Sequence, residues 1–354
     1  MAAATSNHKT SQVARMQSFV TVLLLLSFID LGSALPQASG TVRHEKFQNA
    51  NVVYDWVTDD HHEQLRTFIT RPKAARGKVP VIFFVGWLSC DSVEYPEGET
   101  DGFGAIFHRL IEQSGYATVR MDKPGVGESQ GNCAQTDFQT ELSGYQAAFD
   151  SIKKYDFIDP DKIFVIGLSN GGGTSAFIPR EHSVRGYIAA SSWGRTWYEH
   201  MLELERRRLT KDGRLPGDID QSLKAFSEFY DLYLNRRMTP GEILQQHPQW
   251  NNLWYDRPDG QYGRPAAFYQ QLQALNLGQA WQIVTAPVLV MHGTDDAIMS
   301  DADSRTLAEN VNRTHPGQAR YVEIKDADHL LSAQRKLESS VVPTMLDWMR
   351  EHAN

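Results

Sequence analysis

The chain has 354 residues, of which 41% are hydrophobic, 22% charged and 10% aromatic, and its formal net charge is −8. This composition is that of a globular protein with a sizeable core, and it excludes a disordered or fibrous chain. The net negative charge, with no dense basic run beyond Arg206-Arg207-Arg208, provides no positively charged surface for binding nucleic acid. We interpret that short run as a solvated helix face.

The N-terminal residues have the features of a secretory leader. An apolar stretch from Phe19 to Phe28 follows Lys9 and Arg15, and small residues come next. Because this stretch is shorter than the ~20 residues that a membrane-spanning helix needs, residues 1–34 are predicted to be a signal peptide. The mature chain would then be secreted or periplasmic, without a stable membrane span. A retained membrane anchor is the alternative.

The next segments predict a β-sheet. Alternating and β-branched residues from Thr41 to Val57 and from Glu63 to Thr70 indicate two antiparallel edge strands. Val79 to Trp87 is a continuous apolar run, as expected for a strand buried on both faces of a mostly parallel sheet. Similar runs follow at Tyr116–Met121, Lys162–Leu168, Val184–Ala190 and Pro287–Met291, with a weaker one at Arg320–Lys325.

Helical patterns separate these apolar runs. They cover Phe103–Gln113, Thr140–Lys154, Gly172–Phe177, Asp301–Val311 and Leu337–His352. Alternation of strand and helix predicts right-handed crossovers and a doubly wound, mostly parallel sheet of the α/β class. In such sheets the reactive groups gather at the carboxyl ends of the strands.

Residues 193–281 interrupt this alternation. Apolar residues recur at helical spacing between Leu223 and Leu234, and Thr239-Pro240-Gly241-Glu242 is a capping box that predicts a helix start. We interpret the interval as a helical cap inserted into a core of residues 41–192 and 282–354.

The cap is rich in aromatic residues, namely Trp193, Trp197, Tyr198, Trp250, Trp254 and Trp281. If they roof the pocket, they favour a partly apolar substrate. The alternative is that they form the interior of the cap itself.

Gly167-Leu168-Ser169-Asn170-Gly171 fits the pattern GxSxG between an apolar strand and a run of small residues. A nucleophilic serine on a strained strand-to-helix turn needs glycines on either side so that the backbone can pass closely. Ser169 is therefore the predicted nucleophile, and the N–H of Asn170 is placed to bind an oxyanion.

A serine nucleophile needs a base, and the base needs an orienting carboxylate. Where this turn carries the serine, the acid comes next along the chain and the histidine last. His329 follows the final predicted strand on a loop, so it is the predicted base. The other late histidines are less suited, because they lie in a strand end, a turn and the terminus: His292, His315 and His352.

The acid is predicted from the turn Gly293-Thr294-Asp295-Asp296, which directly follows an apolar strand. Asp296 is our choice and Asp295 the alternative, since aspartate also favours turn positions for local reasons.

The GxSxG turn, the GTDD turn and Asp328-His329, in this order, resemble the α/β-hydrolase superfamily from Val79 to the C-terminus. In that family the acid is usually the fourth residue of a GxxD turn, which corresponds to Asp296. The segment from Asp122 to Ser129 resembles the family's glycine turn, whose role is structural.

The resemblance also implies the second oxyanion donor, which in the family lies after the third strand in an HG motif. This chain has Val85-Gly86-Trp87-Leu88 and lacks the histidine. The N–H of Trp87 is then the implied partner of Asn170, with Leu88 as the alternative. Backbone donors do not require the missing side chain.

Only two cysteines occur, Cys90 and Cys133. An even count is compatible with one disulfide in an oxidising compartment, and two unpaired thiols are the alternative. Neither cysteine has the spacing of a metal ligand, and no nucleotide or metalloprotease motif predicts a cofactor.

These residues predict a serine hydrolase that cleaves a small carboxylic ester through an acyl-enzyme. A serine peptidase or aminopeptidase acting on short peptides is the alternative, with Glu203, Glu205 or Glu228 of the cap as acceptors for a substrate ammonium. A non-catalytic binding protein on the same scaffold is the third hypothesis. The oligomeric state is not predicted.

Overall fold

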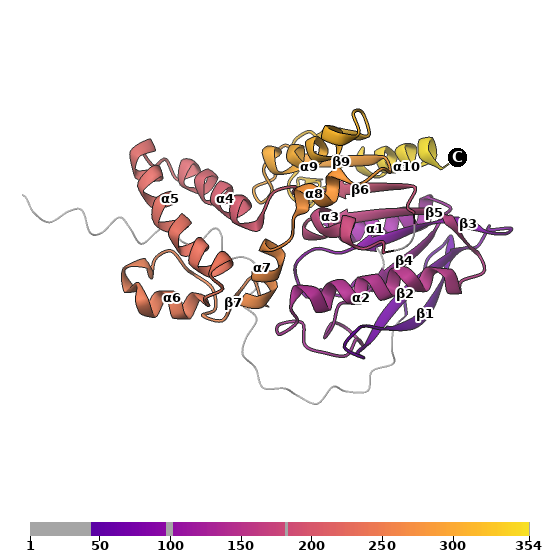
Figure 1. Ribbon diagram of the computed structural model, residues 1–354. Helices are drawn as coiled ribbons and strands as arrows, with labels where there is room; N and C mark the ends of the chain where they lie inside the picture. Colours follow the sequence, from indigo (N-terminus) through magenta and orange to yellow (C-terminus); the bar gives the residue numbers. More distant parts are fainter. Residues whose placement is uncertain (1–43, 97–101, 181–182, 354) are drawn as a thin grey trace, which may run out of the picture. The chain divides into compact units, whose positions relative to one another are not determined.

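The computed structural model of the protein describes residues 44–96, 102–180 and 183–353, and all of them belong to one structural unit. The predicted signal peptide, residues 1–34, lies outside the described residues. Figure 1 shows the arrangement of the helices and strands.

An eight-stranded sheet forms the centre of the fold, in the order β1-β2-β4-β3-β5-β6-β9-β10. Its strands are β1 (Ala50–Thr58), β2 (Gln64–Pro72), β3 (Val79–Val85), β4 (Ala117–Met121), β5 (Ile158–Leu168), β6 (Gly186–Ala190), β9 (Val288–Gly293) and β10 (Ala319–Ile324). β2 is antiparallel to both β1 and β4, and the remaining pairs are parallel. The predicted mostly parallel α/β sheet is therefore confirmed.

Side chains that alternate along the central strands bury both faces of the sheet. Ile82 and Phe84 pack with α1 (Gly102–Gln113) and α10 (Val341–His352). Val81, Phe83 and Val85 belong to the other face, which α2 (Phe138–Asp150), α8 (Leu277–Gln282) and α9 (Asp301–Thr314) cover. In Figure 1, α2 lies in front of the sheet. The two hydrophobic layers explain the continuous apolar runs in the sequence.

A helical insertion, residues 193–281, connects β6 to the last part of the core. It contains α4 (Trp197–Lys211), α5 (Pro216–Tyr230), α6 (Pro240–Gln246), α7 (Ala266–Gln273) and most of α8, together with a short hairpin of β7 (Gly260–Gln261) and β8 (Arg264–Pro265). The predicted capping box is confirmed. The Thr239 side chain accepts a hydrogen bond from the Glu242 N–H, and the Glu242 carboxylate accepts one from the Thr239 N–H. The hairpin gave no recognisable signal in the sequence.

The aromatic residues of the helical insertion lie mainly in its interior. Trp193, Trp197 and Trp281 are 0%, 3% and 0% exposed, and Trp254 stacks on Phe229 with ring centroids 5.3 Å apart. The Trp281 indole N–H also donates to the carbonyl of Gly173 in the core, at 2.9 Å. These rings therefore hold the insertion together and fasten it to the sheet.

One predicted helix begins later than expected. We predicted a helix from Leu337, but Leu337 pairs with Ser332 in a hairpin of β11 (Ser332–Ala333) and β12 (Lys336–Leu337), and α10 starts at Val341. Gln334 and Arg335 both have positive φ angles, 51° and 62°, as a tight two-residue hairpin turn requires. The prediction was wrong because helical spacing alone did not reveal this turn.

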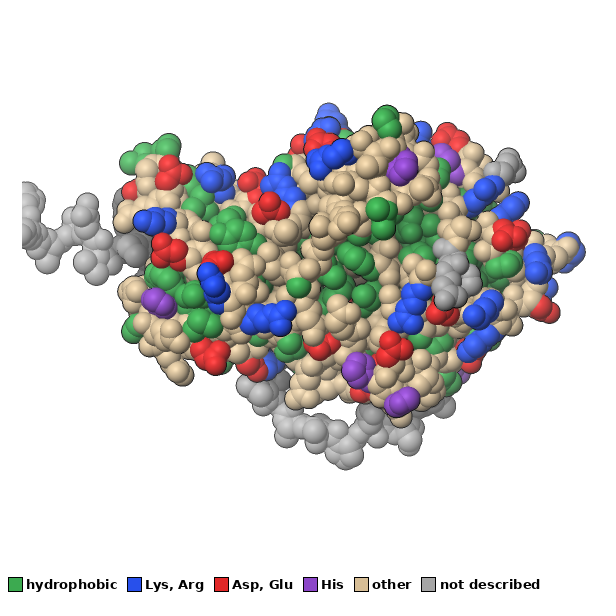
Figure 2. Space-filling model, viewed as in Figure 1, with side chains coloured by type: hydrophobic (Ala, Val, Ile, Leu, Met, Phe, Trp, Pro, Cys, Tyr) green, Lys and Arg blue, Asp and Glu red, His purple; other side chains and the backbone are tan. Residues whose placement is uncertain are grey.

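The described surface carries charges of both signs. In the space-filling view of Figure 2, acidic and basic side chains are interspersed over the visible face. Within the described ranges, no helix is both long enough and apolar enough to traverse a bilayer.

A disulfide joins Cys90, in the loop after β3, to Cys133, in the loop after β4. Cys90 is exposed, whereas Cys133 is buried. The Arg264 guanidinium of β8 donates to the carbonyl of Cys133 at 2.7 Å. Two core loops and the hairpin of the helical insertion therefore meet at this bond.

Replacing both cysteines, as Cys90→Ala with Cys133→Ala, is expected to lower the free energy of unfolding by ~4 kcal/mol, because the bond restrains a loop of 43 residues in the unfolded chain. Urea denaturation followed by tryptophan fluorescence measures the change. Reduced wild-type protein is the control and should match the double variant. An unchanged midpoint in both samples would contradict the prediction.

Candidate active site

Ser169 occupies a strained turn between β5 and α3 (Asn170–Thr174). Its backbone has φ 54° and ψ −122°. This conformation is energetically unfavourable for a residue that has a side chain. Its N–H donates to the carbonyl of Ala190 at 2.9 Å, and the Ser192 hydroxyl donates to its carbonyl at 3.1 Å. Contacts with the end of β6 and the residues that follow therefore maintain the strained conformation.

Gly171 allows this turn to pack directly against the loop after β3. A Cβ atom at Gly171 would lie 2.3 Å from the carbonyl oxygen of Gly86 and 2.4 Å from that of Val85. Both neighbours are backbone atoms that cannot rotate away. The glycine of the GxSxG pattern thus brings the two predicted oxyanion-binding segments together.

Asp296 lies in the turn after β9 and is 2% exposed. Its Oδ1 accepts hydrogen bonds from the N–H groups of Ile298 and Met299, at 2.8 and 2.9 Å. Its Oδ2 lies 2.9 Å from His329 Nδ1. Asp295, the alternative acid, is exposed. Of the two aspartates, the structure therefore brings Asp296 to the histidine.

His329 lies on the loop after β10, and its Nε2 is 3.0 Å from Ser169 Oγ. Asp328 stiffens this loop by accepting hydrogen bonds from the N–H groups of Leu330 and Ser332, at 2.9 and 3.0 Å. The His329 ring also meets the Phe103 ring edge-on, with centroids 5.7 Å apart. The three predicted triad residues are thus joined by two hydrogen bonds through the imidazole.

The N–H groups of Trp87 and Asn170 are the donors predicted to bind an oxyanion. No described residue accepts a hydrogen bond from either group, or from the Leu88 N–H. The preceding N–H, that of Gly86, donates to the Tyr145 hydroxyl at 3.1 Å. Burial raises the pKa of Tyr145, so its oxygen accepts this bond as a neutral hydroxyl. Donors from two segments are therefore present beside the serine turn.

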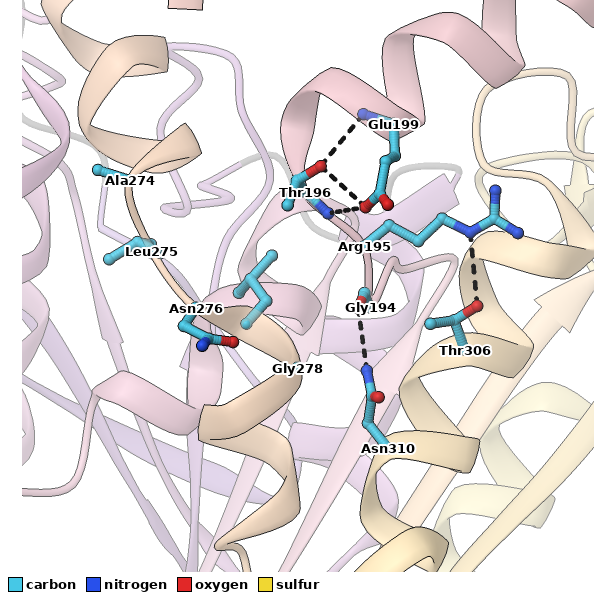
Figure 3. A pocket seen from close by; sticks show the side chains of 11 residues that line it. Gly194, Arg195, Thr196, Glu199, Ala274, Leu275, Asn276, Gly278, Thr306 and Asn310 are labelled. Atoms are coloured by element: carbon cyan, nitrogen blue, oxygen red, sulfur yellow. Dashed lines mark hydrogen bonds between the residues drawn. The ribbon is translucent and has the colours of Figure 1, made fainter. Parts of the chain in front are cut away.

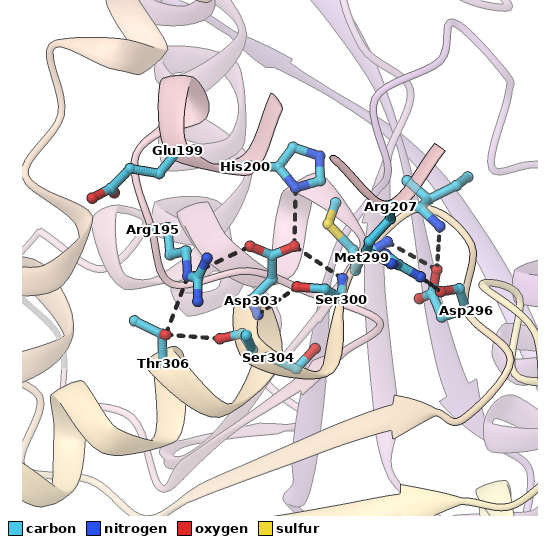
Figure 4. Close-up of polar contacts among 12 residues, drawn as sticks. Arg195, Glu199, His200, Arg207, Asp296, Met299, Ser300, Asp303, Ser304 and Thr306 are labelled. Carbon is cyan, nitrogen blue, oxygen red and sulfur yellow. Dashed lines mark hydrogen bonds and ion pairs between the residues drawn. The ribbon is translucent and has the colours of Figure 1, made fainter. Parts of the chain in front are cut away.

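Sequence reasoning missed one contact to the acid. Arg207 of α4 donates to the backbone carbonyl of Asp296 at 2.5 Å (Figure 4). Arg208, the next residue, is ion-paired with Glu205 and Asp212 at the surface. The predicted solvated helix face is correct for Arg208 and wrong for Arg207.

A second polar contact ties α4 to the same part of the core. His200 Nδ1 lies 3.1 Å from Asp303 Oδ2, and both residues are 1% exposed (Figure 4). Burial alone would raise the pKa of Asp303, but hydrogen bonds from His200 and Ser300 lower it below its usual value. His200 and Arg207 are seven residues apart and so share one helix face. That spacing was the available sequence signal for both contacts.

A cavity of about 680 Å³ opens where the helical insertion leaves the core and rejoins it (Figure 3). Arg195, Thr196, Asn276 and Asn310 are among its lining residues, and no triad residue lines it. Thr196 and Glu199 are bonded to each other in the capping box of α4. The cavity is therefore separate from the serine.

Within the described part of the chain, no cluster of metal-ligating side chains occurs.

The sequence matches the family model described as serine aminopeptidase, S33, over residues 99–332. The chain belongs to this family of α/β hydrolases. A search among curated proteins found no match.

Solved structures with a similar fold include esterases and a peptidase. Est1E from Butyrivibrio proteoclasticus with bound ferulic acid has a TM-score of 0.55 and 18% identity, and the match covers 84% of this chain and 98% of that one. Acetyl xylan esterase 1 from Thermoanaerobacterium sp. gives 0.52 and 14%, over 87% and 86% of the two chains. Pyrococcus horikoshii acylaminoacyl peptidase gives 0.56 and 14%, over 86% of this chain and 42% of that one. At these identities the structures show a shared fold, and family membership makes this chain a serine hydrolase.

Gly171→Ala is expected to lower hydrolytic activity at least ~100-fold, because the new Cβ must separate the serine turn from the loop after β3. Gly217→Ala in α5 is the matched control, since no atom outside its own helix backbone and chain neighbours lies within 4 Å of its added Cβ. Hydrolysis of p-nitrophenyl butyrate by both purified variants tests this. Equal activities would contradict the close approach.

Arg207→Met is expected to lower kcat about tenfold with little change in KM, because the Asp296 turn loses its bond to α4. Arg208→Met removes a neighbouring cation whose ion pairs are exposed, and its kcat should stay within about twofold of wild type. Steady-state kinetics of the two variants measures the difference. The same loss in both would show that the Asp296 contact has no special effect.

Proposed function

We propose that the protein is a carboxylic ester hydrolase that works through an acyl-enzyme on Ser169. The observation that supports this most directly is the position of the His329 imidazole, 3.0 Å from the Ser169 hydroxyl and 2.9 Å from the Asp296 carboxylate. A hydroxyl with an adjacent base, itself oriented by a carboxylate, is the arrangement of an activated nucleophile.

In the first half of the proposed reaction, Ser169 Oγ forms a bond to the ester carbonyl carbon while its proton passes to His329 Nε2. The carbonyl oxygen becomes an oxyanion and accepts hydrogen bonds from the Trp87 and Asn170 N–H groups. Asp296 accepts from Nδ1–H and stabilises the imidazolium that forms. The bond to the alcohol oxygen then breaks, and the alcohol leaves with the proton from Nε2.

In the second half, a water molecule attacks the acyl carbon and gives its proton to His329 Nε2. The same N–H groups bind the second oxyanion. Cleavage of the bond to Ser169 Oγ returns the proton to the serine and releases the carboxylic acid. The cycle consumes one ester and one water, and it needs no cofactor.

Two features favour an ester over a peptide substrate. Glu205 is engaged by Arg208, and Glu228 is exposed on α5, so neither is a free buried acceptor for a substrate ammonium. Among the similar folds, acetyl xylan esterase 1 is an enzyme named for ester cleavage.

An aminopeptidase is the second candidate, and one observation favours it. Glu203 lies one helical turn before Arg207 on α4, so both side chains leave the helix on the same side. Arg207 contacts the Asp296 turn. Glu203 is therefore the cap carboxylate best placed to accept a substrate ammonium.

The proposed setting is an oxidising compartment, secreted or periplasmic. The Cys90–Cys133 disulfide supports this proposal, because such bonds persist where thiols are not kept reduced. A small-molecule substrate fits a serine that is only 6% exposed.

Turnover of p-nitrophenyl butyrate and of leucine p-nitroanilide by the same preparation tests the proposal. We expect faster cleavage of the ester and a loss of at least ~1,000-fold in Ser169→Ala. Ser151→Ala is the matched control, because this buried serine donates to Ala148 at the end of α2 and does not contact the triad.

Faster anilide cleavage that requires a free amine would replace the esterase proposal with the aminopeptidase. A fluorophosphonate probe addresses the third hypothesis, since it should label wild type and Ser151→Ala but not Ser169→Ala. Failure to label folded wild type, together with no turnover, would favour a binding protein.

A further inference from the structure

A buried lysine lies beneath the loop that carries the proposed oxyanion donors. We define the oxyanion loop as residues 86–90, directly after β3. Lys123 follows β4, and its side chain is 5% exposed. Its Nζ donates to the carbonyl of Trp87 and, at 3.0 Å, to the carbonyl of Ser89. The sequence suggested only a structural glycine turn here, and the proposed reaction leaves Lys123 without a role.

These bonds determine the orientation of particular peptide planes. In a trans peptide the C=O and the following N–H point in opposite directions. Lys123 therefore orients the peptide that contains the Leu88 N–H. Tyr145 orients the peptide that contains the Gly86 N–H, with its hydroxyl 3.1 Å from that nitrogen. The peptide that contains the Trp87 N–H lies between these two restrained planes.

The lysine is itself held by a buried ion-pair network. Glu141 of α2 lies 3.6 Å from Lys123 Nζ and is paired with Arg264 of β8. Glu141 and Arg264 are 4% and 2% exposed. Burial and the nearby Arg264 guanidinium lower the pKa of Lys123, and Glu141 is the carboxylate within ion-pair distance of its Nζ. Arg264 also donates to the carbonyl of Cys133, whose disulfide partner Cys90 ends the oxyanion loop.

We propose that Lys123 is a positioning residue that holds the oxyanion loop in its donor geometry, and that Glu141 and Arg264 maintain Lys123 there. Because Arg264 belongs to the helical insertion and pairs with Glu141, the insertion also helps to hold the oxyanion loop in position. This inference rests on the proposed function, because it assumes that the loop binds an oxyanion.

Arg120, on β4 three residues before Lys123, provides a matched control. It is as buried as Lys123, pairs with Glu45 at 2.7 Å and donates to the carbonyl of Val93. Its substitution therefore also removes a buried basic side chain from a carboxylate and a carbonyl. Arg120 makes no contact with the oxyanion loop among the interactions of the described residues.

The test compares Lys123→Met with Arg120→Met in the full chain. For Lys123→Met we expect kcat for p-nitrophenyl butyrate to fall roughly 10- to 100-fold, with KM changed by less than about threefold. Inhibition by n-butylboronic acid should weaken by about the factor by which kcat/KM falls, because its tetrahedral adduct on Ser169 places an oxygen where the oxyanion forms. Arg120→Met should lower the midpoint of thermal unfolding and leave kcat and the boronic acid Ki within about threefold of wild type.

A folded Lys123→Met protein with wild-type kcat and Ki would overturn the inference, as would an equal loss in Arg120→Met. If Lys123→Met does not fold, Glu141→Gln replaces it. We then expect kcat to fall about tenfold with KM preserved, and wild-type kcat would count against the inference. Ser169→Ala distinguishes failure of the proposed function from failure of the proposed role of Lys123. If it remains active, the proposed function fails, whereas inactive Ser169→Ala with wild-type kcat in Lys123→Met overturns only the role of Lys123.

Discussion

The geometry of this site depends on one imidazole that must reach a hydroxyl and a carboxylate at once. His329 lies 160 residues from Ser169 and 33 from Asp296, yet it is 3.0 and 2.9 Å from them. The parallel strands β5, β9 and β10 satisfy this requirement, because their carboxyl ends lie at the same edge of the sheet. Each of the three side chains then needs only a short loop to reach its neighbours.

Close backbone contacts maintain these loops. Gly171 lets the serine turn touch the loop after β3, and a Cβ at Gly293 would lie 2.3 Å from the carbonyl oxygen of Ala327. The acid turn and the histidine loop therefore also pack backbone against backbone. Because there is so little free space, one loop cannot shift without moving the others. This tight packing keeps Ser169 in its strained backbone conformation.

The helical insertion contributes to the site from two sides. Arg207 on α4 binds the carbonyl of Asp296, and Arg264 on β8 pairs with Glu141 beneath the oxyanion loop. Trp281 and Trp193 meanwhile bury the junction with the sheet. The insertion is therefore connected both to the acid turn and to the support of the oxyanion loop, which are far apart in the sequence.

The sequence alone determined the features that depend on a few consecutive residues. The GxSxG turn, the alternation of apolar strands with helices and the capping box at Thr239 all follow from local backbone requirements. His329 was identified by chain order, because it was the late histidine on a loop after a strand. The resemblance to a GxxD turn already favoured Asp296 over Asp295, whereas only the tertiary structure decided that Arg207, and not Arg208, contacts the Asp296 turn. Adjacent residues of the same type have the same local preferences, so only long-range packing determines which side chain faces the site.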